Sequence, residues 1–302
     1  LPVRAIVRRD CGLWRDTPGV ETVVVDLGTD DPEALDAALT GAGSVIHLAT
    51  SLGGDAEAQR RDTARGTDAL LIALGRQNPA PTLVLASSFS VYGYADLPVG
   101  AVIYEATPLE PRPDRRDAYC RGKLEQEAKV RAASRPAWIL RPGAVFGPDR
   151  LWNAHLGLGA GPAAIVLGGD ALVPTAWVEH VAEALLRAAE TPPSGVEVVN
   201  VIDDDLPDQM TYVRAYARSG WPKRILRAPV WPLAAVGAVL GLVPGLSARG
   251  PGLFRPDTRA ARLRPFRYDN GRLKARLGWR PAMTFEEAMD RAIAFSRSED
   301  WA

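Results

Sequence analysis

Tyr119 and Lys123 stand four residues apart in the run Tyr119-Cys120-Arg121-Gly122-Lys123. On a helix, residues at this spacing share a face, so the lysine ammonium would lie near the tyrosine ring. An ammonium beside a phenol favours the phenolate, and a tyrosine in that setting can exchange a proton with a substrate hydroxyl or carbonyl near neutral pH. The same spacing is typical of ordinary surface helices, so these two residues alone leave both interpretations open.

A second group of candidate residues follows a predicted strand upstream. The hydrophobic run that ends at Ala86 is followed by Ser87, Ser88 and Ser90. Open α/β sheets bind ligands at the carboxyl ends of their strands, so Ser88 would present a hydroxyl there and hydrogen-bond a reacting oxygen. For Ser87 and Ser90, helix capping or turn chemistry is an equally good interpretation.

Short apolar runs alternate with helical stretches through the first half of the chain. The predicted strands are 3–7, 23–25, 44–48, 82–86 and 138–140. One predicted helix begins at Pro32, and two others cover 56–74 and 119–133. Near-continuous apolar runs are typical of parallel strands covered on both faces, and Asp31 before Pro32 is an N-cap signal. The pattern predicts an α/β fold with a Rossmann-like, doubly wound parallel sheet.

The pattern is less regular after Pro148. The segment 151–170 is rich in glycine and has no clear period, while 178–190 is predicted to be a helix and 196–202 a strand. Residues 209–302 are predicted to form a smaller, mostly helical region.

The motifs of the chain resemble, in order and spacing, those of the extended short-chain dehydrogenase/reductase family, also called the NAD-dependent epimerase/dehydratase family. The matching pieces are VVVDL (23–27), SVIHLAT (44–50), ARGTDALL (64–71), LASSFSVYG (85–93), YCRGK (119–123), LRPGAVFGP (140–148), WVEHVAEALL (177–186) and LGWRPAMTFEEAM (277–289). Each motif alone is weakly specific for the family. The specificity of the resemblance comes from the order and spacing of all the motifs over nearly the whole chain.

The resemblance implies roles for individual residues. Ser88 takes the position of the catalytic serine, Tyr119 that of the acid/base, and Lys123 that of the lysine that binds the nicotinamide ribose and tunes the tyrosine. The other implied cofactor positions are Asp26 and Leu27 at the adenine, Leu48 and Ala49 beside the pyrophosphate, and Pro142, Gly143 and Val145 at the nicotinamide.

The family pattern opens with a strand and a glycine-rich turn that holds the pyrophosphate at a helix N-terminus. No such turn precedes Leu1, and the glycines of 157–161 follow no apolar strand, so a flexible loop is the better interpretation of that run. We therefore expect about one βα unit of the natural protein to precede Leu1, and the chain without it to bind cofactor poorly. Residues 1–148 would form the dinucleotide-binding domain, with 173–204 packing back onto it, and 149–172 with 205–302 the substrate-binding region.

The end of the strand 3–7 bears on the choice of cofactor. In dinucleotide folds an acidic residue at this place binds the ribose 2′-hydroxyl of NAD, and an arginine accommodates the 2′-phosphate of NADP. Arg8 and Arg9 therefore favour NADP, while Asp10 keeps NAD as the alternative.

The resemblance leaves three functions open. Phe89 follows Ser88, where nucleotide-sugar dehydratases have an acidic pair, and Ala144 stands where sugar-nucleotide epimerases usually carry asparagine. These departures favour an oxidoreductase acting on a carbonyl or hydroxyl group, like the dihydroflavonol-reductase and 3β-hydroxysteroid-dehydrogenase branches. A nucleotide-sugar epimerase is the alternative, and a non-catalytic NADP-binding sensor or scaffold protein is the second alternative.

Composition and charge limit the classes of ligand and partner that the chain can bind. The 36 basic residues balance 36 acidic ones, which gives no electrostatic footprint for nucleic acid. The three histidines show no metal-ligand spacing, and the two cysteines fit a reducing cytoplasm. The uncharged apolar stretch 228–246 indicates either peripheral membrane contact or a buried helix pair, and its prolines argue against a membrane span. We expect a small-molecule substrate and a cytoplasmic protein, with membrane association and a homodimer as open alternatives.

Overall fold

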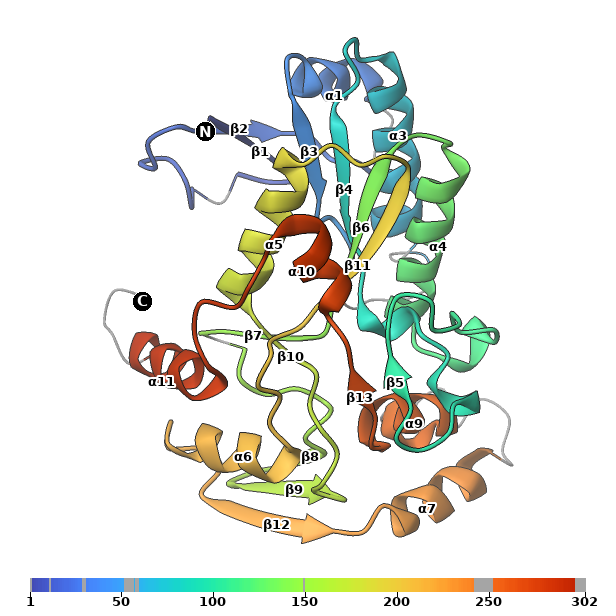
Figure 1. Ribbon diagram of the computed structural model, residues 1–302, viewed down its shortest axis with the longest axis vertical. Coiled ribbons are helices and arrows are strands. Elements are labelled where there is room, and N and C mark those ends of the chain that lie inside the picture. Colours follow the sequence, from blue (N-terminus) through green and yellow to red (C-terminus); the bar gives the residue numbers. More distant parts are fainter. Residues whose placement is uncertain are drawn as a thin grey trace. The chain divides into compact units, whose positions relative to one another are not determined.

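The computed structural model describes residues 2–10, 12–28, 31–51, 57, 60–148, 150–241 and 252–296. Its contacts divide the chain into two compact units. The first unit consists of Leu1–Ser87, Ala118–Ile139 and Ala189–Glu197, and the second of Ser88–Asp117, Leu140–Ala188 and Val198–Ala302. Figure 1 shows the elements along the chain, which alternate between strands and helices in the first unit as the sequence predicts.

A four-stranded sheet runs through the first unit in the order β11-β6-β4-β3. Its strands are β3 (Ser44–His47), β4 (Thr82–Ala86), β6 (Ala137–Pro142) and β11 (Val196–Val201), of which β6 and β11 continue along the chain into the second unit. β3 and β4 are parallel, with Ser44 opposite Thr82 and His47 opposite Leu85. The predicted strands are therefore confirmed, although their ends differ by one or two residues except at β4.

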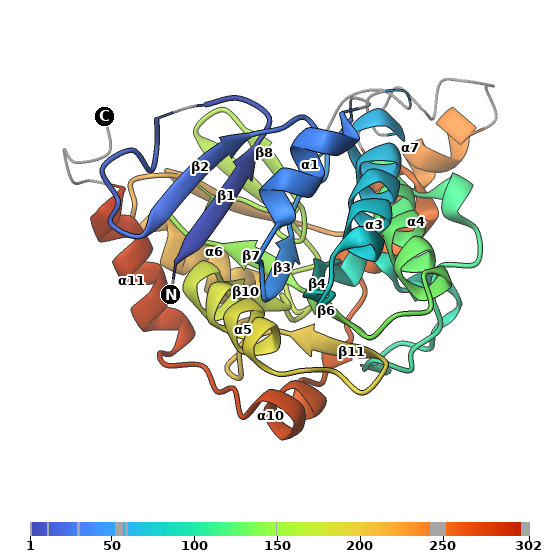
Figure 2. The ribbon, with the colours of Figure 1, turned by 90° about the horizontal axis from the view of Figure 1, so that it is seen from above.

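The first two strands form a separate parallel pair, β1 (Val3–Val7) and β2 (Val20–Val24), in which Val3 lies opposite Val20. Strand β2 thus begins three residues before the prediction. After it comes α1 (Pro32–Leu39), where the Asp31 side chain accepts a hydrogen bond of 3.1 Å from the backbone of Ala34. The N-cap prediction at Asp31 is confirmed, and Figure 2 shows α1 beside α3.

Further helices of the first unit lie between and after these strands. The predicted helix 56–74 is a π-helical turn over Arg60–Arg65 that leads into α3 (Gly66–Arg76), and its predicted start at Ala56 lies outside the described residues. Helix α4 spans Ala118–Ala132 and packs against α3, which also packs against α1. The buried side chains include Leu70, Leu74, Leu83, Leu85, Val130 and Trp138. This apolar core holds α4, and with it Tyr119 and Lys123, in place.

The second unit combines small sheets with helices. β7 (Ala144–Phe146) pairs with β10 (Thr175–Trp177), β5 (Val102–Ile103) with β13 (Arg267–Tyr268), and β8 (Leu158–Ala160), β9 (Ala163–Leu167) and β12 (Arg224–Ala228) form a third sheet. Its α-helices are α5 (Val178–Glu190, which runs into the first unit), α6 (Gln209–Ala217), α7 (Trp231–Gly241), α9 (Pro256–Leu263), α10 (Gly271–Leu277) and α11 (Phe285–Phe295). The mostly helical character predicted after Gln209 is confirmed.

The glycines of 157–161 do not form a loop, so that interpretation was wrong. β8 occupies Leu158–Ala160 and pairs antiparallel with β9. Gly157 has a φ of +113°, and a Cβ there would lie 2.2 Å from the carbonyl oxygen of Ile165. Glycine at this position therefore allows the close strand approach that a side chain would prevent.

Candidate functional site

Tyr119 and Lys123 lie on one face of α4, one turn apart. The Lys123 Nζ is 5.8 Å from the centre of the Tyr119 ring, within the range of a cation–π contact. Tyr119 is half-buried in the first turn of the helix, whereas only 2% of Lys123 is exposed. The structure thus brings these two predicted residues together in the first unit.

Lys123 reaches from α4 to the carboxyl end of β4. Its Nζ donates to the carbonyl oxygen of Ala86 at 2.7 Å and to Oε1 of Gln126 at 3.0 Å. Burial lowers the pKa of Lys123 from 10.5 to about 8, against the opposing effect of the Glu127 carboxylate. An ammonium has three N–H bonds, so with two acceptors among the described residues one donor is left for a ligand.

Gln126 links Lys123 to the end of β3. Its side chain is fully buried, and its Nε2 lies 3.1 Å from the carbonyl oxygen of Ala49 and 3.0 Å from Oγ1 of Thr67. Thr67 gives its single proton to the carbonyl oxygen of Thr63 at 2.6 Å, so its oxygen accepts. The nearby Nε2 of His47, 3.0 Å from that oxygen, therefore carries the proton in their bond.

His47 is neutral in this network. Burial, with the nearby Lys123, lowers its pKa to about 3. The network therefore places one positive charge, that of Lys123, among neutral amide, hydroxyl and imidazole groups. Sequence reasoning missed His47, Thr67 and Gln126. A polar residue at 126, three residues after Lys123 and on the same helix face, was the available signal.

The three serines after β4 have different contacts. Ser87 is buried and donates to Oε1 of Glu127 at 2.6 Å, so its hydroxyl has a structural partner in α4. Ser88, the first residue of the second unit, accepts a hydrogen bond of 3.1 Å from the backbone of Ser90. Because Ser88 Oγ acts as an acceptor in this turn, its hydroxyl proton can still be donated to a ligand oxygen.

The predicted cofactor residues of the first unit lie at strand ends. Leu48, of which 58% is exposed, and the exposed Ala49 follow β3. The half-buried Asp26 and Leu27 follow β2, where Asp26 Oδ1 accepts from the backbone of Gly28 at 2.9 Å. The exposed apolar Leu48 and Ala49 and the third N–H of Lys123 fit a bound dinucleotide whose ribose contacts Lys123.

At the end of β1, one of the two predicted cofactor arginines has a carboxylate partner. Arg9 is exposed, but Nη1 of Arg8 lies 3.1 Å from Oδ2 of Asp62 in the π-helical turn. A 2′-phosphate would have to share Arg8 with that carboxylate. Sequence reasoning also missed Asp62, which lies 54 residues further along the chain.

The remaining predicted positions, Pro142, Gly143 and Val145, belong to the second unit. A Cβ on Gly143 would lie 2.1 Å from the carbonyl oxygen of Pro174, so this glycine is required by close packing of its own backbone. Across the described part of the chain, no group of three His, Cys, Asp or Glu side chains could hold a metal ion.

The buried ammonium gives a pH-dependent stability that can be measured. Because the pKa of Lys123 is about 8 in the folded chain and near 10.5 when unfolded, the unfolded state binds more protons between these values and stability rises with pH there. We compare the unfolding free energies of the parent and of Lys123→Met. Between these two pH values, we expect the parent's value to rise relative to that of the variant by up to about 1.4 kcal/mol per pH unit. Urea unfolding of both proteins at several pH values measures this, and a constant difference would contradict it.

Comparisons with known proteins show the family of the chain. The model of the NAD dependent epimerase/dehydratase family matches residues 3–201. Among curated proteins, the ceramide reductase of Caulobacter vibrioides is 29% identical over 244 residues, which are 78% of this chain and 69% of that protein.

Several solved structures share the fold. MoeE5 in complex with UDP-glucose and NAD matches with a TM-score of 0.70 at 21% identity, over 97% of this chain and 90% of that one. The structure of gox2253 matches with a TM-score of 0.73 at 21% identity, over 97% and 89% of the two chains. The UDP-glucose 4-epimerase of Thermus thermophilus with NAD matches with a TM-score of 0.67 at 20% identity, over 98% and 91%. These likenesses confirm the Rossmann-like α/β fold.

Proposed function

Because this chain belongs to the NAD dependent epimerase/dehydratase family, and is therefore an NAD(P)-dependent enzyme, we propose that it is an oxidoreductase. It moves a hydride to or from a carbonyl or hydroxyl carbon of a small-molecule substrate. The observation that carries the proposal is the pair on α4, in which the buried Lys123 ammonium lies against the Tyr119 ring.

The residues of this chain would share the work as follows. Bound NAD(P) supplies or accepts the hydride. Tyr119 gives a proton to the carbonyl oxygen as the alcohol forms and takes it back in the reverse direction. Ser88 donates its free hydroxyl proton to the same oxygen. Lys123 uses its third N–H to hold a ribose hydroxyl, and its charge favours the phenolate form of the tyrosine.

Two other functions remain as candidates. A nucleotide-sugar epimerase is supported by solved structures of this fold with UDP-sugars, but those likenesses lie near 20% identity. The oxidoreductase is supported by the reductase at 29% identity and by the residues around Ser88 and Ala144. A non-catalytic NADP-binding sensor or scaffold is the least supported, because Tyr119 and Lys123 are both present. Net oxidation or reduction of the cofactor distinguishes the first two, since an epimerase returns its hydride.

The preference for NADP rests on Arg8 and is a proposal. We expect Arg8→Asp to weaken NADP binding by about tenfold or more, because a charged hydrogen bond to the 2′-phosphate is lost and two carboxylates then face that group. NAD binding should change much less. Calorimetric titration of the protein with each cofactor measures both affinities, and Arg65→Asp, which changes the same charge at an exposed position of the first unit, is the control. Equal NADP affinity of the parent and Arg8→Asp would show that Arg8 does not bind the 2′-phosphate.

The domain assignment stays a prediction: residues 1–148, with 173–204 packing back, bind the dinucleotide, and 149–172 with 205–302 bind the substrate. A homodimer and a cytoplasmic location are likewise proposals without a contact in the structure to support them.

Membrane contact through 228–246 is supported by the surface of α7. Trp231 is 71% exposed and Val236 is also exposed, whereas Val230 and Leu233 pack against a buried leucine cluster, so α7 has one covered face and one exposed apolar face. Exposed Lys223 and Arg224 precede it and could meet anionic lipid. Within the described residues no helix is long and apolar enough to cross a membrane, and 242–246 lie outside them.

We expect Trp231→Ala combined with Val236→Ser to reduce co-sedimentation with anionic vesicles several-fold, because the buried apolar area falls. Trp14→Ala removes another exposed tryptophan, in the first unit, and is the matched control. Equal sedimentation of all three proteins would exclude α7 as the contact.

A further inference from the structure

A cavity of about 560 Å³ lies in the second unit among two short 3-10 helices, η3 (Tyr94–Asp96) and η4 (Pro113–Arg115), and helix α9. Its charged lining consists of Arg112, Arg115, Arg259 and Arg264 with Asp96 and Asp257. The four arginines exceed the two aspartates, so the cavity carries an excess of positive charge. None of Ser88, Tyr119 and Lys123 lines it, and its function is separate from the hydride transfer proposed above.

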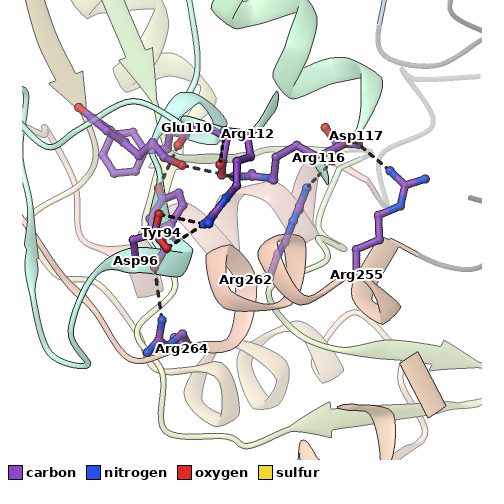
Figure 3. A network of polar contacts seen from close by, with 11 residues as sticks. Tyr94, Asp96, Glu110, Arg112, Arg116, Asp117, Arg255, Arg262 and Arg264 are labelled. Carbon is purple, nitrogen blue, oxygen red and sulfur yellow. Dashed lines mark hydrogen bonds and ion pairs between the residues drawn. The ribbon is translucent and has the colours of Figure 1, made fainter. Parts of the chain in front are cut away.

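Two of these arginines are held by the segment that carries η3. Nη2 of Arg112 lies 2.7 and 2.9 Å from the two carboxylate oxygens of Asp96. Nη1 of Arg264 donates to the carbonyl oxygens of Tyr94 and Ala95, at 3.4 and 3.0 Å. Figure 3 shows these contacts. They fix the guanidinium groups in place while leaving Nε and Nη2 of Arg264 available to a ligand.

The other two arginines lack a carboxylate partner. Nη1 of Arg259 donates to the carbonyl oxygens of Leu253 and Phe254, and burial lowers the pKa of this guanidinium. Within the part of the chain that the structure describes, no carboxylate forms an ion pair with Arg115, Arg259 or Arg264. A partly buried cation without a counter-charge is unfavourable, so an anion in this cavity would stabilise Arg259.

Asp257 supplies a second requirement on the ligand. Only 7% of this residue is exposed, and its buried Oδ2 has no hydrogen-bond partner among the described residues. The buried Nε of Arg112 also has none. An unpaired buried polar atom is unfavourable, so a ligand with both an anionic group and a hydroxyl would satisfy both atoms.

The rest of the lining is apolar. Val230, Pro256, Leu263 and Pro265 contribute carbon surface, and Val230 is followed directly by the exposed Trp231 of α7. We propose that the cavity binds the phosphoryl group of an amphiphilic molecule, whose hydroxyl donates to Asp257 and whose apolar part lies against Val230 and Leu263. A phosphate monoester fits several guanidiniums better than a carboxylate, because it offers three acceptor oxygens and up to two charges.

The test is a calorimetric titration of the whole chain with 1-hexanoyl lysophosphatidic acid, a water-soluble phosphate monoester with a free hydroxyl and an acyl chain, and with inorganic phosphate. Arg115→Glu is the main variant, since Arg115 is exposed and its side chain makes no hydrogen bond or ion pair with the residues that the structure describes. Arg214→Glu changes the same charge on the exposed face of α6 and is the matched control. A second variant, Arg259→Gln, removes the partly buried cation.

We expect both phosphate compounds to bind, inorganic phosphate more weakly because it lacks the apolar part. Arg115→Glu and Arg259→Gln should each weaken binding by about tenfold, and Arg214→Glu by less than about twofold. Absence of binding, or equal binding by all variants, would overturn the proposal.

Vesicles then distinguish the source of the phosphate. If phosphatidylcholine vesicles containing lysophosphatidic acid bind the parent but not Arg115→Glu, and pure phosphatidylcholine vesicles bind neither, the ligand is a lipid head group. If only the soluble compound binds through Arg115, the ligand is a free phosphorylated amphiphile. Activity is not used in either measurement, so the result does not depend on the proposed oxidoreductase function.

Discussion

Tyr119→Phe is expected to lower kcat by about a hundredfold to ten-thousandfold, because the substrate oxygen loses its proton donor and acceptor. The change removes one oxygen atom and keeps the ring that lies 5.8 Å from Lys123 Nζ. The cofactor should therefore bind the variant with the affinity of the parent. Steady-state kinetics with a carbonyl substrate, together with titration of the cofactor, measure the two quantities separately.

Tyr104→Phe is the matched control. Tyr104 is exposed in the second unit, and removal of its hydroxyl should leave kcat unchanged. An active Tyr119→Phe protein would reject the acid/base role of this residue. A variant that has lost cofactor affinity as well as turnover would mean that Tyr119 acts in binding.

Gln126→Leu should have the second-largest effect, acting through Lys123. The leucine removes the acceptor 3.0 Å from Nζ and the donor 3.1 Å from the carbonyl oxygen of Ala49. We expect the unfolding free energy to fall by about 2–4 kcal/mol, because several buried polar groups lose partners. We also expect kcat/KM to fall by up to about a hundredfold, because Lys123 is no longer held in position.

Gln126→Glu separates positioning from simple loss of structure. A carboxylate beside the ammonium stabilises its charged form and raises the pKa of Lys123, whereas leucine lowers it further. The basic limb of the pH profile of kcat/KM should therefore move to higher pH in Gln126→Glu and to lower pH in Gln126→Leu. Profiles that move together, or not at all, would show that Gln126 is only structural.

The local part of this site could be predicted from the sequence. A spacing of four residues fixes two side chains on one helix face whatever surrounds it, so Tyr119 and Lys123 meet as expected. Asp31 before Pro32 likewise starts α1 by bonds within one turn. Such features depend on neighbours in the chain, which the sequence displays directly.

The rest depends on residues that are distant in the chain. Gln126 meets Ala49 and Thr67 only because α4 packs beside α3 and the end of β3, across 77 and 59 residues. Arg8 was expected to meet the cofactor, and its ion pair with Asp62 forms only because the π-helical turn comes close to the end of β1. Strand β12 joins β9 across about 60 residues, and its short, largely exposed run Arg224–Ala228 gives no strong local signal. These pairings follow from the fold and not from any short motif.

The hydride itself gives the most direct test of the proposed reaction. The protein is incubated with a carbonyl substrate and reduced cofactor that carries deuterium at both hydrogens of nicotinamide C4, and the product is examined by mass spectrometry while the absorbance of the reduced cofactor is followed. The oxidoreductase proposal predicts one deuterium in each product molecule and one cofactor oxidised for each product formed. Product formed without net consumption of cofactor, or without deuterium on its carbon, would contradict it.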